Sequence, residues 1–148
     1  MPTETVNGAD LYYESAGDGT AIVLLHGVLM SSRFFSEQQP LSDTYQLITL
    51  DFRGHGRYEK TDTGHTLPQY ARDLEAFLDA QTLSDVVVVG WSMGSLVAWE
   101  YMRQFGTDRL QGFVSVDQQP LDLEQEGYEH GVFDFADLSG LMELTQTD

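Results

Sequence analysis

The sequence contains no cysteine, and Lys60 is its single lysine. Without cysteine the chain can form neither disulfides nor thiolate metal sites, which is typical of cytoplasmic proteins. No apolar run is long enough to cross a bilayer, and the first residues lack the basic and apolar segments of a signal peptide. No histidine or carboxylate cluster has the spacing of metal ligands. We therefore expect a cytoplasmic protein without metal or other cofactor.

Basic residues are also scarce: seven face 24 acidic ones, and the net charge is −17. This excess disfavours nucleic acid and anionic membrane as partners. Halophilic proteins use acidic surfaces that self-repel at low ionic strength, so the composition favours a salt-loving source. An ordinary acidic cytosolic protein is the alternative. The length of 148 residues suits one domain with a buried core.

Strand-like and helix-like segments alternate along the first 120 residues. A hairpin is expected at residues 5–14, around an Asn-Gly turn. Further strands are expected at residues 21–25, 45–50, 86–89 and 110–116, and helices at 66–81, 95–105 and, more weakly, 30–43. This alternation predicts an α/β fold with a mostly parallel sheet and flanking helices.

The most informative stretch is residues 85–106. An unbroken valine run is followed by Gly90-Trp91-Ser92-Met93-Gly94 and then by apolar residues at helical spacing. Strand, G-x-S-x-G and helix in this order form a nucleophile elbow, which holds the serine in a strained turn. A side chain at Gly90 or Gly94 would collide with neighbouring backbone. The alternative is a tight strand-to-helix turn with an incidental serine.

Three motifs together, LLHGV, DFRGHG and GWSMGS, each follow a predicted strand. From about Thr5 to Pro120 the chain resembles the α/β-hydrolase superfamily, and within it the small esterases, lactonases, perhydrolases and non-haem haloperoxidase-like proteins. The resemblance implies that Ser92 is the nucleophile of a serine hydrolase that acts on a small ester or lactone. It also implies an oxyanion hole made by the backbone N–H groups of Val28 and Met93. His26 and Gly27 would shape the loop that carries Val28.

The resemblance also implies a catalytic acid and a histidine after Ser92 in the chain. The sequence stops at Asp148, before the strands that would carry them, so we expect the N-terminal part of an α/β hydrolase that lacks the C-terminal strands. Asp117 and His130 are the candidates inside the chain. Asp117 could instead cap a turn before Pro120, and His130 belongs to a segment that resembles the start of a lid.

Other polar and aromatic residues near these motifs have structural interpretations. His55 is expected in a structural turn at a strand end, and Asp51 and Arg53 are expected to satisfy backbone groups or to pair there. His65 is expected to be solvated. The side chains that could line a pocket near Ser92, or belong to the core, are Trp91, Phe34 and Phe35.

We expect a hydrolase core over residues 1–120, and the start of a cap or an acidic tail over 121–148. Without later strands, residues 110–116 would form an exposed apolar edge through which the chain could self-associate. A catalytically silent fragment that self-associates or binds a partner is therefore one alternative function. C–C hydrolysis and perhydrolysis with the same elbow are others. Serine at the elbow disfavours haloalkane dehalogenases and epoxide hydrolases, which carry aspartate there.

Overall fold

The computed structural model describes residues 3–121, 124 and 126–131. The chain divides into two units, Met1–Gln118 and Gln119–Asp148, and the helices and strands of the described residues lie in the first. The strands are β1 (Thr3–Val6), β2 (Ala9–Ala16), β3 (Ala21–Leu25), β4 (Gln46–Leu50), β5 (Val86–Trp91) and β6 (Leu110–Val116). The helices are η1 (Ser32–Asp43), α1 (Leu67–Ala80) and α2 (Met93–Phe105).

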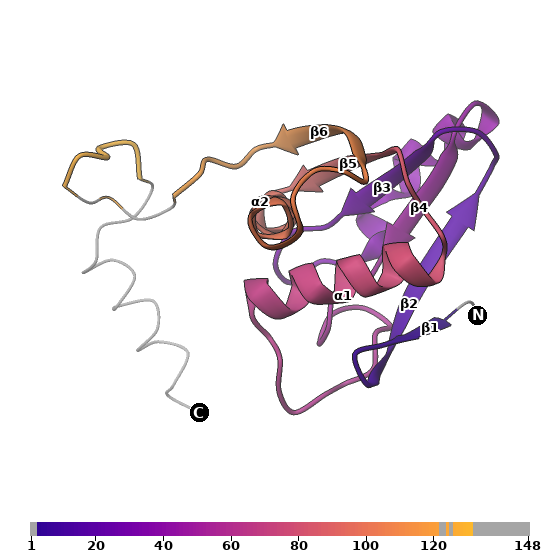
Figure 1. The fold of residues 1–148 in the computed structure, drawn as a ribbon, viewed down its shortest axis with the longest axis horizontal. Helices are drawn as coiled ribbons and strands as arrows, with labels where there is room; N and C mark the ends of the chain where they lie inside the picture. The colour runs from indigo at the N-terminus through magenta and orange to yellow at the C-terminus, as the bar shows by residue number, and fades with distance from the viewer. Residues whose placement is uncertain (1–2, 122–123, 125, 132–148) are drawn as a thin grey trace. The chain divides into compact units, whose positions relative to one another are not determined.

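The strands form one 6-stranded mixed sheet in the order β1-β2-β4-β3-β5-β6 (Figure 1). β1 pairs antiparallel with β2, and β2 pairs antiparallel with β4. β4, β3, β5 and β6 run parallel to one another. Parallel neighbours need crossover connections, which the helices supply here. The predicted α/β fold with a mostly parallel sheet is therefore confirmed.

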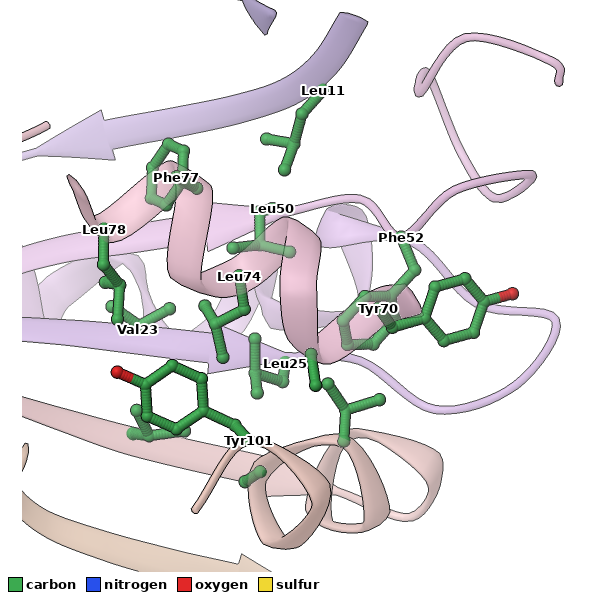
Figure 2. Close-up of a cluster of buried hydrophobic side chains, with 14 of the residues drawn as sticks. Leu11, Val23, Leu25, Leu50, Phe52, Tyr70, Leu74, Phe77, Leu78 and Tyr101 are labelled. Carbon is green, nitrogen blue, oxygen red and sulfur yellow. The ribbon is translucent and has the colours of Figure 1, made fainter. Parts of the chain in front are cut away.

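The two faces of the sheet bury different helices. Successive strand residues point to opposite faces, so Val23 and Leu25 of β3 pack with the α1–α2 side while Leu24 packs with Phe35 of η1. Figure 2 shows the core on the side of α1 and α2, where Leu74 of α1 gathers with side chains of the central strands. Each fully buried aliphatic side chain of this kind contributes about 1.5–3 kcal/mol.

The hairpin and the first α-helix form as predicted. Asn7 and Gly8 have positive φ angles of 47° and 78° between β1 and β2, as a two-residue hairpin of type I′ requires. At the start of α1, the side chain of Thr66 accepts a hydrogen bond from the N–H of Gln69. This cap satisfies one of the N–H groups that have no partner within the helix.

Segment 30–43 forms a different kind of helix from the others. It is a 3₁₀ helix, and the backbone of Phe35 has non-helical angles at a kink. Pro40 lies inside this helix and has no N–H to donate, which disfavours a regular α-helix there. The weak helical character of the sequence therefore gives a helix, but a tighter and less regular one.

β6 forms one edge of the sheet, and no other strand of the described residues pairs with its outer side. Val114 and Val116 of this strand are 48% and 41% exposed. The edge is therefore open and apolar, as predicted from the sequence. Self-association through this edge stays a prediction.

Parts of the second unit lie outside the described residues, namely 122–123, 125 and 132–148. The expectation of a cap or an acidic tail over residues 121–148 falls largely on them and stays a prediction. Within the described residues, no helix has the length and apolar character needed to cross a membrane. The same part of the chain contains no group of three or more potential metal ligands that could hold a metal ion.

Candidate active site

Ser92 occupies a sharp turn between β5 and α2. Its backbone has φ 50° and ψ −122°, a conformation that residues with a side chain rarely adopt. The Ser92 N–H donates to the carbonyl oxygen of Val116 at 3.0 Å, and the Ser95 N–H donates to the carbonyl oxygen of Ser92 at 2.8 Å. These bonds hold the turn at the N-terminus of α2. The Ser92 side chain is half-buried and makes no hydrogen bond to another described residue.

Glycine is required on both sides of this turn. A Cβ added to Gly90 would lie 2.5 Å from the backbone nitrogen of Ser95, and one added to Gly94 would lie 2.1 Å from the carbonyl oxygen of Leu25. Real Cβ atoms do not approach backbone atoms so closely. The collisions expected from the sequence at Gly90 and Gly94 are therefore present in the structure.

The loop after β3 lies directly against the turn. A Cβ added to Gly27 would lie 2.5 Å from the Trp91 ring and 3.3 Å from the Cβ of Ser92. The loop turns sharply, since the Met30 N–H donates to the Gly27 carbonyl oxygen at 3.3 Å. Val28, inside this turn, has a backbone N–H that no described group accepts.

Met93 is the other residue expected to supply an N–H donor. It is the first residue of α2, so its N–H has no carbonyl partner within the helix. The N-terminus of a helix also carries a partial positive charge. The start of α2 and the loop carrying Val28 thus bring two candidate oxyanion donors to the neighbourhood of Ser92.

His26 is completely buried at the end of β3, and both of its ring nitrogens are engaged. The Phe52 N–H donates to Nε2 at 3.1 Å, and Nδ1 lies 2.7 Å from the carbonyl oxygen of Gly27. Nε2 must therefore be the acceptor and Nδ1 the protonated donor. Burial lowers the pKa of His26 to about 4, which keeps the ring neutral. His26 thus ties the loop to the start of the DFRGHG segment, and its lone pair is not free to act as a base.

The DFRGHG segment is held by buried polar contacts. Asp51 is fully buried, and its carboxylate accepts the backbone N–H groups of Ser32 and Arg57, each at 2.6 Å. Arg53 forms a buried ion pair with Asp73 at 3.0 Å. Asp51 and Arg53 therefore have the structural contacts expected from the sequence.

The remaining histidines of the first unit also bond to backbone. Nδ1 of His55 lies 3.1 Å from the Arg53 carbonyl oxygen, and Nε2 of His65 lies 2.8 Å from that of Thr61. His65 is exposed, as expected, and also bonds within its own loop. No histidine of residues 3–118 hydrogen-bonds to Ser92.

An apolar pocket of about 280 Å³ lies on the η1 side of β5. Its lining residues are Leu24, Phe34, Phe35, Gln38, Trp91 and Val116. The rings of Phe34 and Trp91 stack with their centroids 4.1 Å apart and only 12° between their planes. Because Trp91 directly precedes Ser92, the three aromatic side chains line a pocket beside the turn.

The sequence profile described as "alpha/beta hydrolase fold" matches residues 20–138. The chain belongs to the α/β-hydrolase family. The resemblance seen in the three motifs is thereby confirmed at the level of the family, and the strand, sharp turn and helix around Ser92 have the arrangement expected of a nucleophile elbow.

Known relatives extend well beyond this α/β-hydrolase chain. A putative non-heme chloroperoxidase from Synechocystis sp. is 34% identical, over 90% of this chain and 53% of its own. The bromoperoxidase from Bacillus anthracis has a TM-score of 0.88 at 31% identity, over 95% of this chain and 52% of its own. An esterase from Exiguobacterium antarcticum has a TM-score of 0.90 at 27% identity, over 99% of this chain and 55% of its own. The chain therefore spans about half the length of the relatives it matches, in line with the resemblance to the N-terminal part of an α/β hydrolase.

The candidate acid and the candidate base of this α/β hydrolase, Asp117 and His130, belong to different units. Asp117 is exposed and follows β6 directly, with a positive φ of 52°. The β5–β6 register pairs Trp91 with Val116, so Asp117 comes next to Ser92 at the strand ends. His130 is exposed in the second unit, where its ring contacts that of Tyr128. Their roles as acid and base stay predictions.

Two buried polar residues were not anticipated, one beside the DFRGHG segment and one in the elbow. The carboxylate of Asp73 accepts hydrogen bonds from Asn7 and Gln69 in addition to its ion pair. The hydroxyl of Ser95 donates to the Gly90 carbonyl oxygen at 2.6 Å and fixes the elbow from within. The available signal for Asp73 was its place beside the apolar stripe of helix 66–81. Ser95 carried no comparable signal, since serine is ordinary in a first helical turn.

Proposed function

We propose that this chain carries the nucleophile and oxyanion hole of a serine hydrolase that acts on a small ester or lactone. The main support is the Ser92 hydroxyl, which makes no hydrogen bond to another described residue at the strained turn before α2. Strain of this kind costs about 1–3 kcal/mol and is kept where function requires it. The backbone N–H of Met93 is one proposed oxyanion donor. The other is the N–H of Val28, in the loop whose Gly27 lies against Ser92.

The proposed reaction has two stages. Ser92 Oγ attacks the acyl carbon while a base removes its proton, and the carbonyl oxygen becomes an oxyanion bound by the N–H groups of Val28 and Met93. The alcohol then leaves with a proton, and an acyl-enzyme remains. Water attacks this intermediate, releases the carboxylic acid and restores Ser92. Each oxyanion donor is worth about 3 kcal/mol in the transition state.

Asp117 and His130 are the candidate acid and base within this chain, and the order Ser92, Asp117, His130 is that of the family. The apolar pocket beside Trp91 would hold the acyl group, because its lining is mostly aromatic and aliphatic. The name of the esterase from Exiguobacterium antarcticum supports ester hydrolysis.

Perhydrolysis is a second candidate, favoured by the names of the relatives called chloroperoxidase and bromoperoxidase. In that reaction hydrogen peroxide replaces water in the second stage, so that the acyl-enzyme yields a peracid. Nucleophile and oxyanion donors stay the same. Assaying the products of ester turnover with and without hydrogen peroxide distinguishes the two reactions.

Labelling with a fluorophosphonate tests the nucleophile directly. An activated Ser92 displaces fluoride and forms a phosphonyl ester, which mass spectrometry locates. We expect labelling of the wild-type chain and of Ser42→Ala, a half-buried serine on η1, but not of Ser92→Ala. The labelling is done in low and in high salt, because the acidic composition favours folding in salt. Absence of labelling in a chain shown to be folded would contradict the proposal.

A further inference from the structure

Arg33 stands apart from the other basic residues. All seven lysine and arginine residues lie in the described part of the chain. The six others have these partners: Arg53 with Asp73, Arg57 with Glu14, Arg72 with Gln69, Arg103 with Glu100, Arg109 with Asp79, and Lys60 with the carbonyl oxygens of Gly54 and Gly56. The Arg33 side chain makes no hydrogen bond or ion pair with any described residue, although the chain has 24 acidic residues.

The Arg33 side chain lines a hollow next to the elbow loop. This hollow has a volume of about 390 Å³, within the range of small-molecule sites. Its lining residues are Leu29, Met30, Ser31, Arg33, Phe34 and Gly56. Leu29, Met30 and Phe34 are exposed apolar side chains, at 87%, 42% and 44%. The hollow thus offers one positive charge surrounded by apolar surface.

One ring contact and one chain connection link this hollow to the elbow. Phe34 forms part of its wall, and the Phe34 ring stacks on Trp91, the residue before Ser92. Leu29 and Met30 directly follow Val28, whose N–H is a proposed oxyanion donor. An anion bound at Arg33 would therefore sit on the same loop that approaches Ser92.

The charge arrangement favours a carboxylate over a more highly charged anion. A guanidinium group can donate two parallel hydrogen bonds to one carboxylate. Asp51 and Arg57 line a neighbouring hollow that also contains Arg33. The Asp51 oxygens are engaged by the Ser32 and Arg57 N–H groups, and the Arg57 guanidinium pairs with Glu14 at 3.0 Å. The buried Asp51 carboxylate, together with the net charge of −17, would repel a phosphate dianion more strongly than a monoanion.

We propose that Arg33 and the hollow of Leu29, Met30, Ser31, Phe34 and Gly56 bind a carboxylate attached to a short aliphatic group. The carboxylate pairs with the guanidinium, and the aliphatic carbons contact the three apolar side chains. The preferred substrates are then esters or lactones that carry a free carboxylate besides the reacting bond. This consequence for the substrate rests on the proposed function, whereas the binding site does not.

Binding is tested first, without any turnover. The full chain is titrated with hexanoate and, separately, with uncharged hexanamide at the same ionic strength, and tryptophan fluorescence is followed because Trp91 stacks on Phe34. We expect hexanoate to bind the wild-type chain saturably. Hexanamide should bind the wild-type chain at least about tenfold more weakly, and hexanoate should bind Arg33→Gln at least about tenfold more weakly. Arg103→Gln, an exposed arginine on α2, serves as the matched control and should bind hexanoate like wild type. Equal binding of hexanoate and hexanamide, or of hexanoate to wild type and Arg33→Gln, would overturn the proposal.

Turnover is tested second, with para-nitrophenyl butyrate and the para-nitrophenyl monoester of glutaric acid, which retains a carboxylate. The measured quantity is the ratio of kcat/KM for the charged ester to that for the neutral one. This ratio should fall at least about tenfold in Arg33→Gln and stay at the wild-type value in Arg103→Gln. An unchanged ratio in Arg33→Gln would show the substrate preference to be wrong. The two proposals can fail separately. If hexanoate binding depends on Arg33 but the fluorophosphonate does not label Ser92, the binding site is supported and only the proposed reaction is contradicted.

Discussion

Gly94 at the start of α2 packs directly against Leu25 at the end of β3. A Cβ built on Gly94 would be 2.1 Å from the Leu25 carbonyl oxygen and 2.9 Å from the Leu25 Cβ. The first turn of the elbow helix is thus in contact with the strand that leads into the Val28 loop. This close approach sets the distance between the Ser92 turn and the loop.

Gly94→Ala should therefore separate the two elements and destabilise the fold. We expect a loss of about 2 kcal/mol or more in the free energy of unfolding, because backbone atoms must move to admit the methyl group. Gly112→Ala in β6 is the control, since a Cβ there meets nothing within 4 Å. Urea denaturation followed by circular dichroism measures both. Equal stability of the two variants would refute the packing argument.

Ser92→Gly should make the protein more stable than Ser92→Ala. Alanine keeps the Cβ that disfavours φ 50°, while glycine adopts positive φ without that cost. We expect a difference of about 1 kcal/mol in the free energy of unfolding. Neither variant should react with the fluorophosphonate. If the glycine variant melts no later than the alanine variant, the backbone at Ser92 is not strained.

Asp73→Asn should be strongly destabilising. It leaves the buried Arg53 guanidinium without its counter-charge, which costs about 3 kcal/mol or more. Glu100→Gln, which breaks the surface pair with Arg103, should have a much smaller effect because solvent screens it. The comparison uses thermal melts at one salt concentration. A mild effect of Asp73→Asn would mean that water reaches Arg53.

His26 should make the protein sensitive to acid. Its pKa is lowered by burial to about 4 in the folded chain, against 6.5 for a free histidine. Between these values the unfolded chain binds a proton and the folded chain does not, so stability falls as pH drops from about 6.5 to about 4, by about 3 kcal/mol in total. Below about pH 4 the loss levels off, since the folded form is then protonated as well.

The difference between wild type and His26→Gln isolates this effect from that of the many carboxylates. His26→Gln should be less stable at pH 7.5, where it lacks the paired imidazole, and should lose less stability between pH 7 and pH 4.5. Urea denaturation at several pH values and constant ionic strength measures both slopes. Parallel slopes would show that His26 does not titrate as proposed.

Much of the fold could be predicted from local pattern. The valine run before Ser92, the Asn7-Gly8 turn and the Thr66 cap each depend on residues within a few positions, so their structures follow from the sequence. The type of helix over residues 30–43 could not be predicted in this way, because a weak apolar period and an internal proline leave it undecided.

The sequence by itself determined the strand–turn–helix at Ser92, the α/β class and the order of the motifs, because each is encoded within a short stretch of chain. Only the tertiary structure decided which distant groups meet. It placed Gly27 against Ser92, occupied both nitrogens of His26, and paired Arg53 with Asp73. It also left Arg33 without a partner among the described residues. Such contacts join residues far apart in the chain, and local spacing carries no information about the distance between them.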